Sequence, residues 1–328
     1  STAQPATEID ADLYVVGPET PLVQGLADQL RSEGRTVFGP GAKGARLEGS
    51  KAWMKGLVET AGVPTARYGS FDKDQTDSAI AFLSTLAPPY VVKTDGLAAG
   101  KGVLVTETYA EAVEDVKAKL SGAAFGDSGR RVVIEEGLTG PELSLFAFCD
   151  GVKAVLLPTS AQDHKRLCDS DLGPNTGGMG CYSPMPDISA ADLHEMMDKA
   201  VHPTVSELRQ RGVDYRGVLF AGFMITADGP KLLEFNVRFG DPEAQVILPR
   251  FEGDLAETLF QVANGDLRIR PTLSNDAMVA VVLASHGYPT APQTGDVIHG
   301  LDQARDIEGV NVFCAGVASN SHDELITG

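Results

Sequence analysis

Basic residues are scarce in this 328-residue chain, which has 27 lysines and arginines against 45 aspartates and glutamates and a net charge of −18. Binding to duplex nucleic acid needs a basic footprint, so this function class is disfavoured. Docking to an anionic membrane surface is disfavoured for the same reason. A small anionic ligand is not excluded, because a local cluster of cations can bind one within an acidic protein.

Long apolar runs and paired cysteines are also lacking. No apolar stretch approaches the roughly 20 residues that a membrane helix needs. The opening residues, STAQPATEIDAD, have neither the basic nor the apolar region of a secretory signal peptide. The four cysteines form no CxxC pair, which disfavours a disulfide framework and a zinc site. These absences favour a reducing, cytoplasmic location.

What is present is an alternation of apolar runs and amphipathic segments. Residues 12–47 predict strand, helix, strand and short helix, as in the last part of a doubly wound domain. An amphipathic helix capped by Ser50 follows, and strands and helices then alternate. After Pro271 the sequence predicts strands with short turns, within MVAVVLAS, GDVIHG and NVFCAG, so we place a boundary near residues 273–277.

The segment KTDGLAAGKGV, residues 93–103, is a glycine-rich loop between two predicted strands. It differs from a P-loop because three residues separate Gly96 from Gly100 and because Gly102 stands in the Ser/Thr position. It is closer to the flap that covers ATP in kinases. Taken alone, a tight turn with a solvated lysine is an equally good interpretation. Lys93, at the end of an apolar strand, favours a phosphate site.

The segment VVIEEGLTGPELS ends an apolar strand with acidic residues. A strand edge beside a nucleotide can offer backbone groups to adenine and a carboxylate to ribose. A solvated acidic turn is the better interpretation of this segment alone, since glutamate is mostly exposed.

A long loop, SAQDHKRLCDSDLGPNTGGMGCYSP, is rich in glycine and mixed polar residues. Loops of this length inside a compact domain are usually functional or disordered. Met179, Cys181 and Tyr182 favour an ordered loop on the substrate side. For His164 alone, a surface histidine with a structural role is more probable than a catalytic one.

The segment EFNVRF, residues 234–239, alternates polar and apolar residues, which predicts a strand. Glu234, Asn236 and Arg238 share one face. Carboxylate and amide oxygens suit Mg²⁺, and a guanidinium binds a carboxylate or phosphate with two hydrogen bonds. The alternative is an ordinary polar outer face, but GDPE adds further acids just beyond it. Together, the four segments predict a magnesium-nucleotide site.

The chain resembles the ATP-grasp ligases and, among them, the glycinamide ribonucleotide synthetase family. The resemblance spans nearly the whole chain, in the family's order. It rests on VVGPETPLVQG, GSKAWMK, VVKTDGLAAGKGV, VIEEGLTGPELS, TSAQDHKR, GPNTGGMGCYSP, LEFNVRFGDPEAQ and TGDVIHG.

The resemblance implies an α/β and α+β multidomain protein. Its parts would be the remnant of an N-terminal doubly wound, biotin-carboxylase-like substrate domain (1–49), an ATP-grasp domain (50–275) with a flap subdomain at about 66–136, and a partial C-terminal β-rich domain (276–328). Family members begin with a GGREHA-type turn that is absent here, and their C-terminal domain continues beyond Gly328. We therefore expect this chain to be part of a longer protein, and catalysis to fail if both missing parts are truly absent.

The implied reaction is a step of purine biosynthesis. ATP phosphorylates glycine to glycyl phosphate, and the amine of 5-phosphoribosylamine attacks it, giving glycinamide ribonucleotide, ADP and phosphate. Such phosphoryl transfer needs positioning and cations, so we expect no covalent enzyme intermediate. The implied cofactors are ATP with Mg²⁺ or Mn²⁺. The partners are these small molecules, and the enzyme would be a monomer or a weak homo-oligomer.

The site residues carry over position by position. Nucleotide binding is implied for Lys51, Lys93, Gly96, Gly100, Lys101, Gly102, Glu135, Glu136, Leu138 and Glu142, the last as the ribose-binding acid. Substrate binding is implied for Glu19, His164, Lys165, Asp171, Asn175, Gly177, Gly178, Gly180 and Arg238. Catalysis is implied for Arg238, Asp241 and Lys93, and metal binding for Glu234 and Asn236. The alternatives are another ATP-grasp carboxylate–amine ligase, a different ATP-grasp chemistry such as bicarbonate-dependent carboxylation, and a non-catalytic nucleotide-binding fragment.

Overall fold

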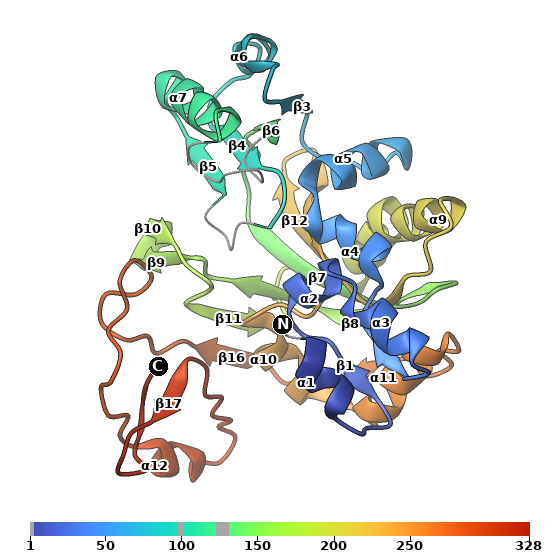
Figure 1. Cartoon of the computed structure of the whole chain (residues 1–328), viewed down its shortest axis with the longest axis vertical. Helices are drawn as coiled ribbons and strands as arrows, with labels where there is room; N and C mark the ends of the chain where they lie inside the picture. Colours follow the sequence, from blue (N-terminus) through green and yellow to red (C-terminus); the bar gives the residue numbers. More distant parts are fainter. Residues whose placement is uncertain (1–2, 98–101, 123–130) are drawn as a thin grey trace.

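The computed structural model describes residues 3–97, 102–122 and 131–328 (Figure 1). The N-terminal region contains a small parallel pair of strands flanked by helices, as the sequence predicts. Its elements are α1 (Ala3–Glu8), β1 (Tyr14–Val15), α2 (Glu19–Val23), α3 (Leu26–Ser32), β2 (Val37–Phe38) and α4 (Ala42–Gly49). Leu22, Leu30 and Val37 are buried and belong to the largest hydrophobic core of the chain. This shared core packs the N-terminal region against the rest of the chain.

Helix α5 (Lys51–Thr60) leads from this region into the flap subdomain. Ser50 caps it, because its Oγ accepts a hydrogen bond from the Trp53 N–H at 3.2 Å. The buried face carries Met54, Leu57 and Val58, and also Lys55, whose charge needs a partner in the interior.

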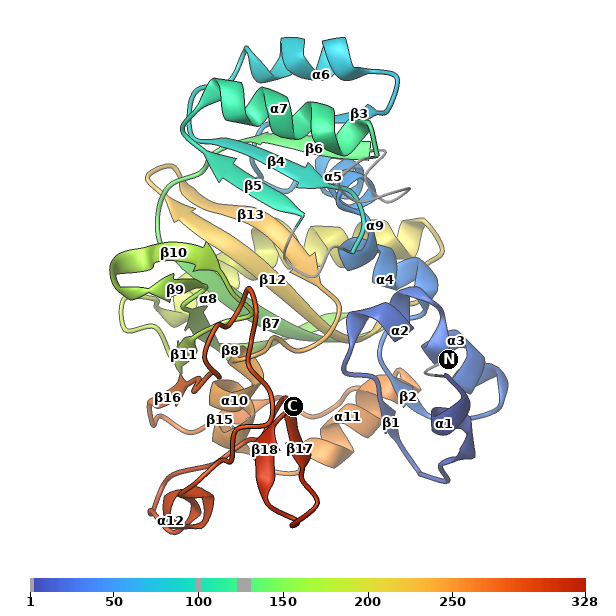
Figure 2. The same cartoon turned by 60° about the vertical axis from the view of Figure 1, so that its left-hand side comes forward.

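The flap subdomain is a four-stranded antiparallel sheet with spatial order β3-β6-β4-β5. Its elements are β3 (Tyr68–Asp72), α6 (Thr76–Leu83), β4 (Tyr90–Thr94), β5 (Val103–Thr106), α7 (Tyr109–Leu120) and β6 (Arg131–Glu136). Figure 2 shows α6 and α7 on the outer side of this sheet, away from the rest of the molecule. The helices and strands share a separate core that includes Leu83, Val92, Val116 and Ile134.

The larger sheet is six-stranded, and neighbouring strands run antiparallel. In spatial order the strands are β13 (Gly229–Asn236), β12 (Arg216–Thr226), β7 (Glu142–Asp150), β8 (Ala154–Asp163), β11 (Gly180–Ser183) and β16 (Met278–Val281). Along β7, Leu145 and Ala147 face one core, whereas Phe146 and Phe148 face another. Both faces of this strand are therefore covered, which accounts for its continuous apolar sequence.

Helices cover the two faces of the large sheet. One core includes side chains from α8 (Ala190–Met196), the π-helical turn η3 (Met197–Val201) and α9 (His202–Gln210). The other includes side chains from α10 (Glu243–Ile247) and α11 (Leu255–Asn264). None of the helices in the described residues has the length and apolarity that crossing a bilayer requires.

The predicted long loop after β8 contains a small antiparallel pair of strands. Its elements are β9 (Arg166–Cys168), the 3-10 turn η2 (Asp169–Asp171) and β10 (Leu172–Asn175). The remaining elements are the 3-10 turn η4 (Leu248–Arg250), β14 (Phe251–Glu252), β15 (Thr272–Leu273), α12 (Leu301–Arg305), β17 (Val317–Ser319) and β18 (Leu325–Thr327).

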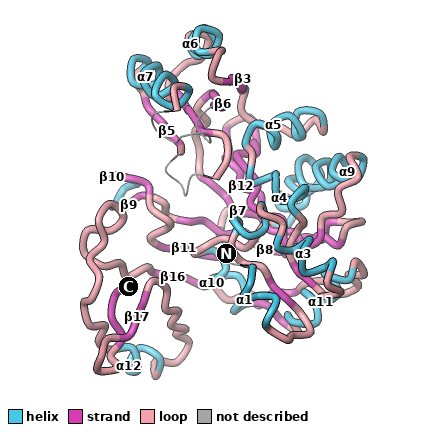
Figure 3. Tube along the Cα trace, viewed as in Figure 1, coloured by secondary structure: helices cyan, strands magenta, loops and turns pink. Residues whose placement is uncertain are grey.

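The C-terminal segment is less regular than the sequence predicts. The segment MVAV forms β16, but GDVIHG makes only an isolated bridge, from Val297 to Ile326. The prediction of a strand at NVFCAG is wrong, since β17 begins at Val317. Figure 3 shows this segment mainly as loop. Residues 311–315 have no hydrogen-bonded neighbour strand among the described residues, and an apolar run without one does not form a strand.

Candidate active site

The site is centred on Glu234, on the face of β13 predicted to be polar. Figure 2 shows β13 and β12 beneath the flap sheet. Burial alone would raise the pKa of Glu234, but four surrounding cations hold it below its ordinary value. They are Lys165, Lys93, Lys51 and Arg238. These residues lie far apart in sequence, and the fold brings all four around one carboxylate.

Each of these cations has another contact. Lys51 Nζ donates to the Gly96 carbonyl at 3.0 Å, and Lys93 Nζ lies 2.9 Å from Glu135 Oε1. Lys165 pairs with Glu142, and Arg238 pairs with Glu48. Across the described part of the chain, no ion pair joins Glu234 itself to a lysine or arginine. The carboxylate is thus influenced by four positive charges, which we call the ring of cations, and none of them pairs with it directly among the described residues.

The N-terminus of α5 holds the base of the flap loop. Asp95 Oδ1 accepts hydrogen bonds from the Ala52 N–H and from Ser50 Oγ, both at 3.1 Å. Asp95 therefore satisfies one of the free N–H groups at the helix start and also ties β4 to α5. Burial lowers the pKa of the neighbouring Lys51, although Glu234 opposes this. Gly96 and Gly102 are described, whereas Gly100 and Lys101 lie outside the described residues.

Lys93 belongs to a buried cluster of three charged side chains. Glu135 on β6 is 2% exposed, with Oε1 2.9 Å from Lys93 Nζ and Oε2 2.9 Å from Lys55 Nζ. Burial would raise the pKa of Glu135, but the two ammonium groups lower it. The resemblance groups Glu135 with the nucleotide-binding residues of the adenine side. In the structure its carboxylate pairs with two lysines.

The strand that leads out of the flap places Glu136 and Leu138 at a partly exposed edge. Glu136 Oε1 accepts a hydrogen bond from the Arg67 N–H at 3.0 Å and lies 3.7 Å from Lys231 Nζ. Glu142, at the start of β7, pairs with Lys165. This pair joins the predicted ribose-binding acid to the predicted substrate loop.

The substrate loop is ordered by its own backbone and by the C-terminal segment. The Thr176 N–H donates to the Lys165 carbonyl at 2.8 Å, and the Gly177 N–H donates to Tyr288 Oη at 2.9 Å. Gly178 has a φ of 116°, which favours glycine. His164 is exposed, and its Nε2 lies 3.3 Å from the Cys168 carbonyl, as expected of a surface histidine.

The other residues of this loop that are predicted to bind substrate differ in their location and exposure. Gly180 begins β11, and Asn175 is exposed at the end of β10. Asp171 ends η2, and its side chain lies outside the described residues. A side chain at Gly178 would meet Pro242 and Asp163, so this glycine lies beside them, while Asn175 is exposed.

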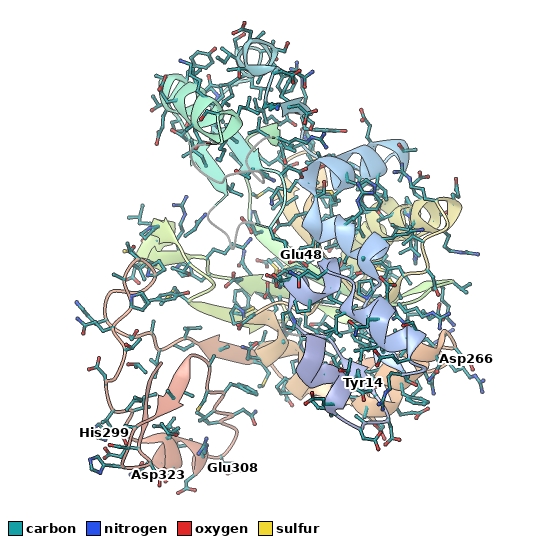
Figure 4. All side chains as sticks on the ribbon, in the orientation of Figure 1. Tyr14, Glu48, Asp266, His299, Glu308 and Asp323 are labelled. Carbon is teal, nitrogen blue, oxygen red and sulfur yellow. The ribbon has the colours of Figure 1, made fainter. Side chains whose placement is uncertain are left out.

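Arg238 joins the site to the N-terminal region. Its Nη2 lies 2.9 Å from Glu48 Oε1, and its Nε lies 3.6 Å from Glu19 Oε2. Glu48 also accepts a hydrogen bond from the Val237 N–H at 2.8 Å, so β13 ends at Asn236 and not at Phe239 as the alternation predicts. Burial raises the pKa of Glu48, although Arg238 opposes this. Figure 4 labels Glu48 where α4 meets the large sheet.

A group of acids lies beside the ring of cations. Burial and the nearby Glu243 raise the pKa of Asp163 to about 7. Glu243 is 3% exposed, and its Oε1 accepts a hydrogen bond from Ser144 Oγ at 3.0 Å. Asp241, predicted to be catalytic, accepts a hydrogen bond from Gln245 Nε2 at 2.7 Å.

The sequence did not predict several residues that lie in or beside the site. They are Lys55, Glu48, Asp95, Asp163 and Tyr288. The spacing of Lys55 with Met54 and Val58 on one helix face is a signal that the sequence offers, since a lysine on a buried face needs a partner. The others depend on contacts between distant segments.

The donors that remain for a metal ion are few. Among the described residues, no group of three or more His, Cys, Asp or Glu side chains could hold one. Glu234 and Asn236 offer one carboxylate and one amide oxygen two residues apart. This set fits Mg²⁺ or Mn²⁺, which accept hard oxygen ligands and take further ones from water and phosphates.

Comparison with known proteins gives consistent matches along the chain. Residues 1–48, 49–244 and 278–328 match the N domain, the ATP-grasp (A) domain and the C domain of phosphoribosylglycinamide synthetase. Phosphoribosylamine–glycine ligase of Mesorhizobium japonicum is 48% identical over 310 residues, which are 94% of this chain and 72% of that protein.

Two solved structures extend the comparison. Phosphoribosylamine–glycine ligase from Thermotoga maritima matches with a TM-score of 0.80 and 33% identity, covering 100% of this chain and 78% of that one. Biotin carboxylase from Campylobacter jejuni matches with a TM-score of 0.69 and 16% identity, covering 90% of this chain and 64% of that one. At that identity the second match shows the fold alone.

The match of residues 49–244 to an ATP-grasp domain, together with the shared fold, shows that the chain is an ATP-grasp ligase. The matches confirm the fold class and the ligase class expected from the sequence, and ATP-grasp enzymes use ATP. Within that class, the chain belongs to the phosphoribosylglycinamide synthetase family.

Proposed function

We propose that the chain joins glycine to 5-phosphoribosylamine at the expense of ATP, giving glycinamide ribonucleotide, ADP and phosphate in purine biosynthesis. The observation that carries this proposal is the set of four cations near Glu234, which distant segments of the chain place there and which keep contacts of their own to Gly96, Glu135, Glu142 and Glu48. A site that brings together ATP and a carboxylate substrate holds several negative charges, and these cations offset their mutual repulsion. The name shared by the relatives supports the choice of substrates.

In the first step, the γ-phosphoryl group of ATP transfers to a carboxylate oxygen of glycine, and ADP leaves. Lys51 and Lys93 would contact the phosphates, with Gly96 and Gly102 at the two ends of the flap loop. Arg238 would bind the glycine carboxylate or the acyl phosphate, because its guanidinium can form two parallel hydrogen bonds. Asp241 would lie at the same end of β13.

In the second step, the amine nitrogen attacks the acyl carbon, phosphate leaves, and a proton is lost from nitrogen. Within the described ranges, the residues around Glu234 offer cations and oxygen ligands but no activated serine or cysteine. We therefore assign the protein the tasks of positioning and charge stabilisation. Glu234 and Asn236 would hold Mg²⁺ or Mn²⁺, which supplies charge neutralisation to the phosphates when bound.

The substrate loop and the N-terminal region complete the proposed site. His164, Lys165 and the backbone of Gly177, Gly178 and Gly180 would face the sugar phosphate and glycine. Glu19 would take part through its contact with Arg238. Glu136 and Leu138 would border adenine, and Glu142 would face the ribose. We keep the proposed domain division of 1–49, 50–275 and 276–328, and we propose a monomer or a weak homo-oligomer.

The test is the dependence of ADP release on each substrate. Protein, MgATP, glycine and phosphoribosylamine are mixed, and each component is omitted in turn. Release that needs both glycine and the sugar amine supports the proposal. No release, or release with bicarbonate in place of glycine, would overturn it.

A matched pair of variants tests the role of Glu234. Glu234→Gln should lower turnover by at least about 100-fold and raise the half-saturating Mg²⁺ concentration, because an amide ligand carries no charge. Glu252→Gln, which changes an exposed glutamate on β14, should leave both values unchanged. An unchanged Mg²⁺ dependence in Glu234→Gln would refute the ligand role.

A further inference from the structure

Lys55 is a buried lysine to which the proposed reaction gives no task. Its side chain on α5 is 0% exposed. Its Nζ lies 2.9 Å from Glu135 Oε2, donates to Thr65 Oγ1 at 2.8 Å, and lies 5.6 Å from the centre of the Tyr68 ring. A buried ammonium costs free energy unless it is paired, so this position requires an explanation.

The charges of the cluster supply that explanation. Glu135 lies between Lys55 and Lys93, with one carboxylate oxygen on each ammonium at 2.9 Å. With Lys93 alone, Glu135 would form a neutral pair and cancel most of the attraction of Lys93 for a phosphate. With both lysines charged, the three groups carry a net charge of one positive unit. Glu234 is near enough to raise the pKa of Lys93, so the positive charge of the cluster lies beside the proposed site.

A second contact fixes the position of Lys55 relative to the metal-binding strand. Thr65 Oγ1 accepts a hydrogen bond from Lys55 and donates one to the Leu232 carbonyl at 2.6 Å. The Leu232 N–H in turn donates to the Pro64 carbonyl at 2.8 Å. Leu232 is two residues before Glu234 on β13. The lysine cluster and the proposed metal ligands are therefore held on one hydrogen-bonded frame.

From these contacts we infer that Lys55 is a positioning residue for ATP: it neutralises Glu135 so that Lys93 keeps an uncompensated positive charge for the polyphosphate. This inference rests on the proposed function for its substrate, MgATP, and not on the identity of the acceptor. A lysine with a structural role alone would not behave in this way. Under the inference, the effect of losing Lys55 on MgATP affinity depends on the negative charge of Glu135.

The experiment measures the affinity of the chain for MgATP by titration calorimetry, which does not need turnover. Lys55→Met should weaken binding by at least about tenfold, because Glu135 would then cancel the charge of Lys93. Lys55→Met combined with Glu135→Gln should regain at least about threefold of this loss, since the cancelling charge is gone. Lys55→Met within about threefold of the original chain, or a double variant no better than Lys55→Met, overturns the inference.

Lys119→Met is the matched control. Lys119 is also buried, at 2% exposed, and its Nζ donates to the Val92 carbonyl on β4 at 3.0 Å, but it does not contact Glu135. Its loss should change stability and leave MgATP affinity within about twofold. If Lys119→Met weakens MgATP binding as much as Lys55→Met does, the effect is structural and the inference fails.

Two further comparisons keep the inference testable. If Lys55→Met does not fold, the double variant is compared with Glu135→Gln alone. Neither protein has the Glu135 charge, so Lys55 has nothing to neutralise in either. The two should therefore bind MgATP within about threefold of each other. A larger difference overturns the inference. Chain that binds MgATP as predicted but releases no ADP with glycine and phosphoribosylamine would refute the proposed function and leave the role of Lys55 intact.

Discussion

Replacing Asp163 with asparagine should stabilise this protein above neutral pH. Asp163 is half-buried at the end of β8, and burial together with Glu243 raises its pKa to about 7. One carboxylate oxygen is buried without a hydrogen-bond partner among the described residues. Asparagine has nearly the same shape, so the substitution removes the charge without leaving a cavity.

The size of the effect follows from the pKa. The native state holds the proton of Asp163 more tightly than the unfolded chain, so this group lowers the free energy of unfolding as pH rises from the ordinary value of 3.8 to about 7. Each pKa unit corresponds to about 1.4 kcal/mol, which gives an upper bound of about 4 kcal/mol at pH 8. Solvent near this half-buried side chain reduces the cost, so we expect about 2 kcal/mol, or roughly 4 °C in Tm.

The assay is thermal unfolding of ligand-free protein from pH 4 to pH 8. Asp163→Asn should exceed the original chain in Tm at pH 8. The difference should become small near pH 4, close to the ordinary pKa of 3.8, because the carboxyl is protonated in the native state and partly protonated in the unfolded chain. Asp228→Asn, in the exposed turn between β12 and β13, is the control and should show no such trend. A difference that is absent at pH 8, or that does not change with pH, would refute the reasoning.

Two further substitutions test how the site is held together. Asp95→Ala removes the acceptor for the Ala52 N–H and Ser50 Oγ. It should cost about 1 kcal/mol of stability and raise the KM for ATP, measured by thermal unfolding and initial rates; an unchanged KM would contradict the role at the flap base. Tyr288→Phe removes the acceptor for the Gly177 N–H and should raise the KM for glycine or phosphoribosylamine about fivefold without affecting ATP. Equal changes for all three substrates would argue against a local effect.

Local patterns in the sequence were sufficient for much of the fold. The continuous apolar run of β7 reflects a strand covered on both faces, and Ser50 caps α5 as its position predicts. The polar face of β13 also follows from alternation. These features depend on neighbours within a few residues, so the sequence displays them directly.

The partners of the site residues were not predictable in this way. Glu135 lies on an acidic strand end, and nothing nearby in the sequence shows that Lys55, 80 positions earlier, binds its second oxygen. The end of β13 at Asn236 depends on Glu48, which is equally remote in sequence. Such contacts are set by how subdomains pack, and a single sequence without tertiary information does not encode them in a local pattern.

The alternation along β7 has a consequence for how the protein tolerates change. Leu145 and Ala147 fill one core and Phe146 and Phe148 the other, so a change in the size of one side chain affects one core only. Inserting or deleting one residue would instead exchange the aliphatic and aromatic faces along the rest of the strand. It would also shift Glu142, at the strand start, relative to Lys165. The length of the strand therefore determines where Glu142, the proposed ribose-binding acid, lies relative to Lys165.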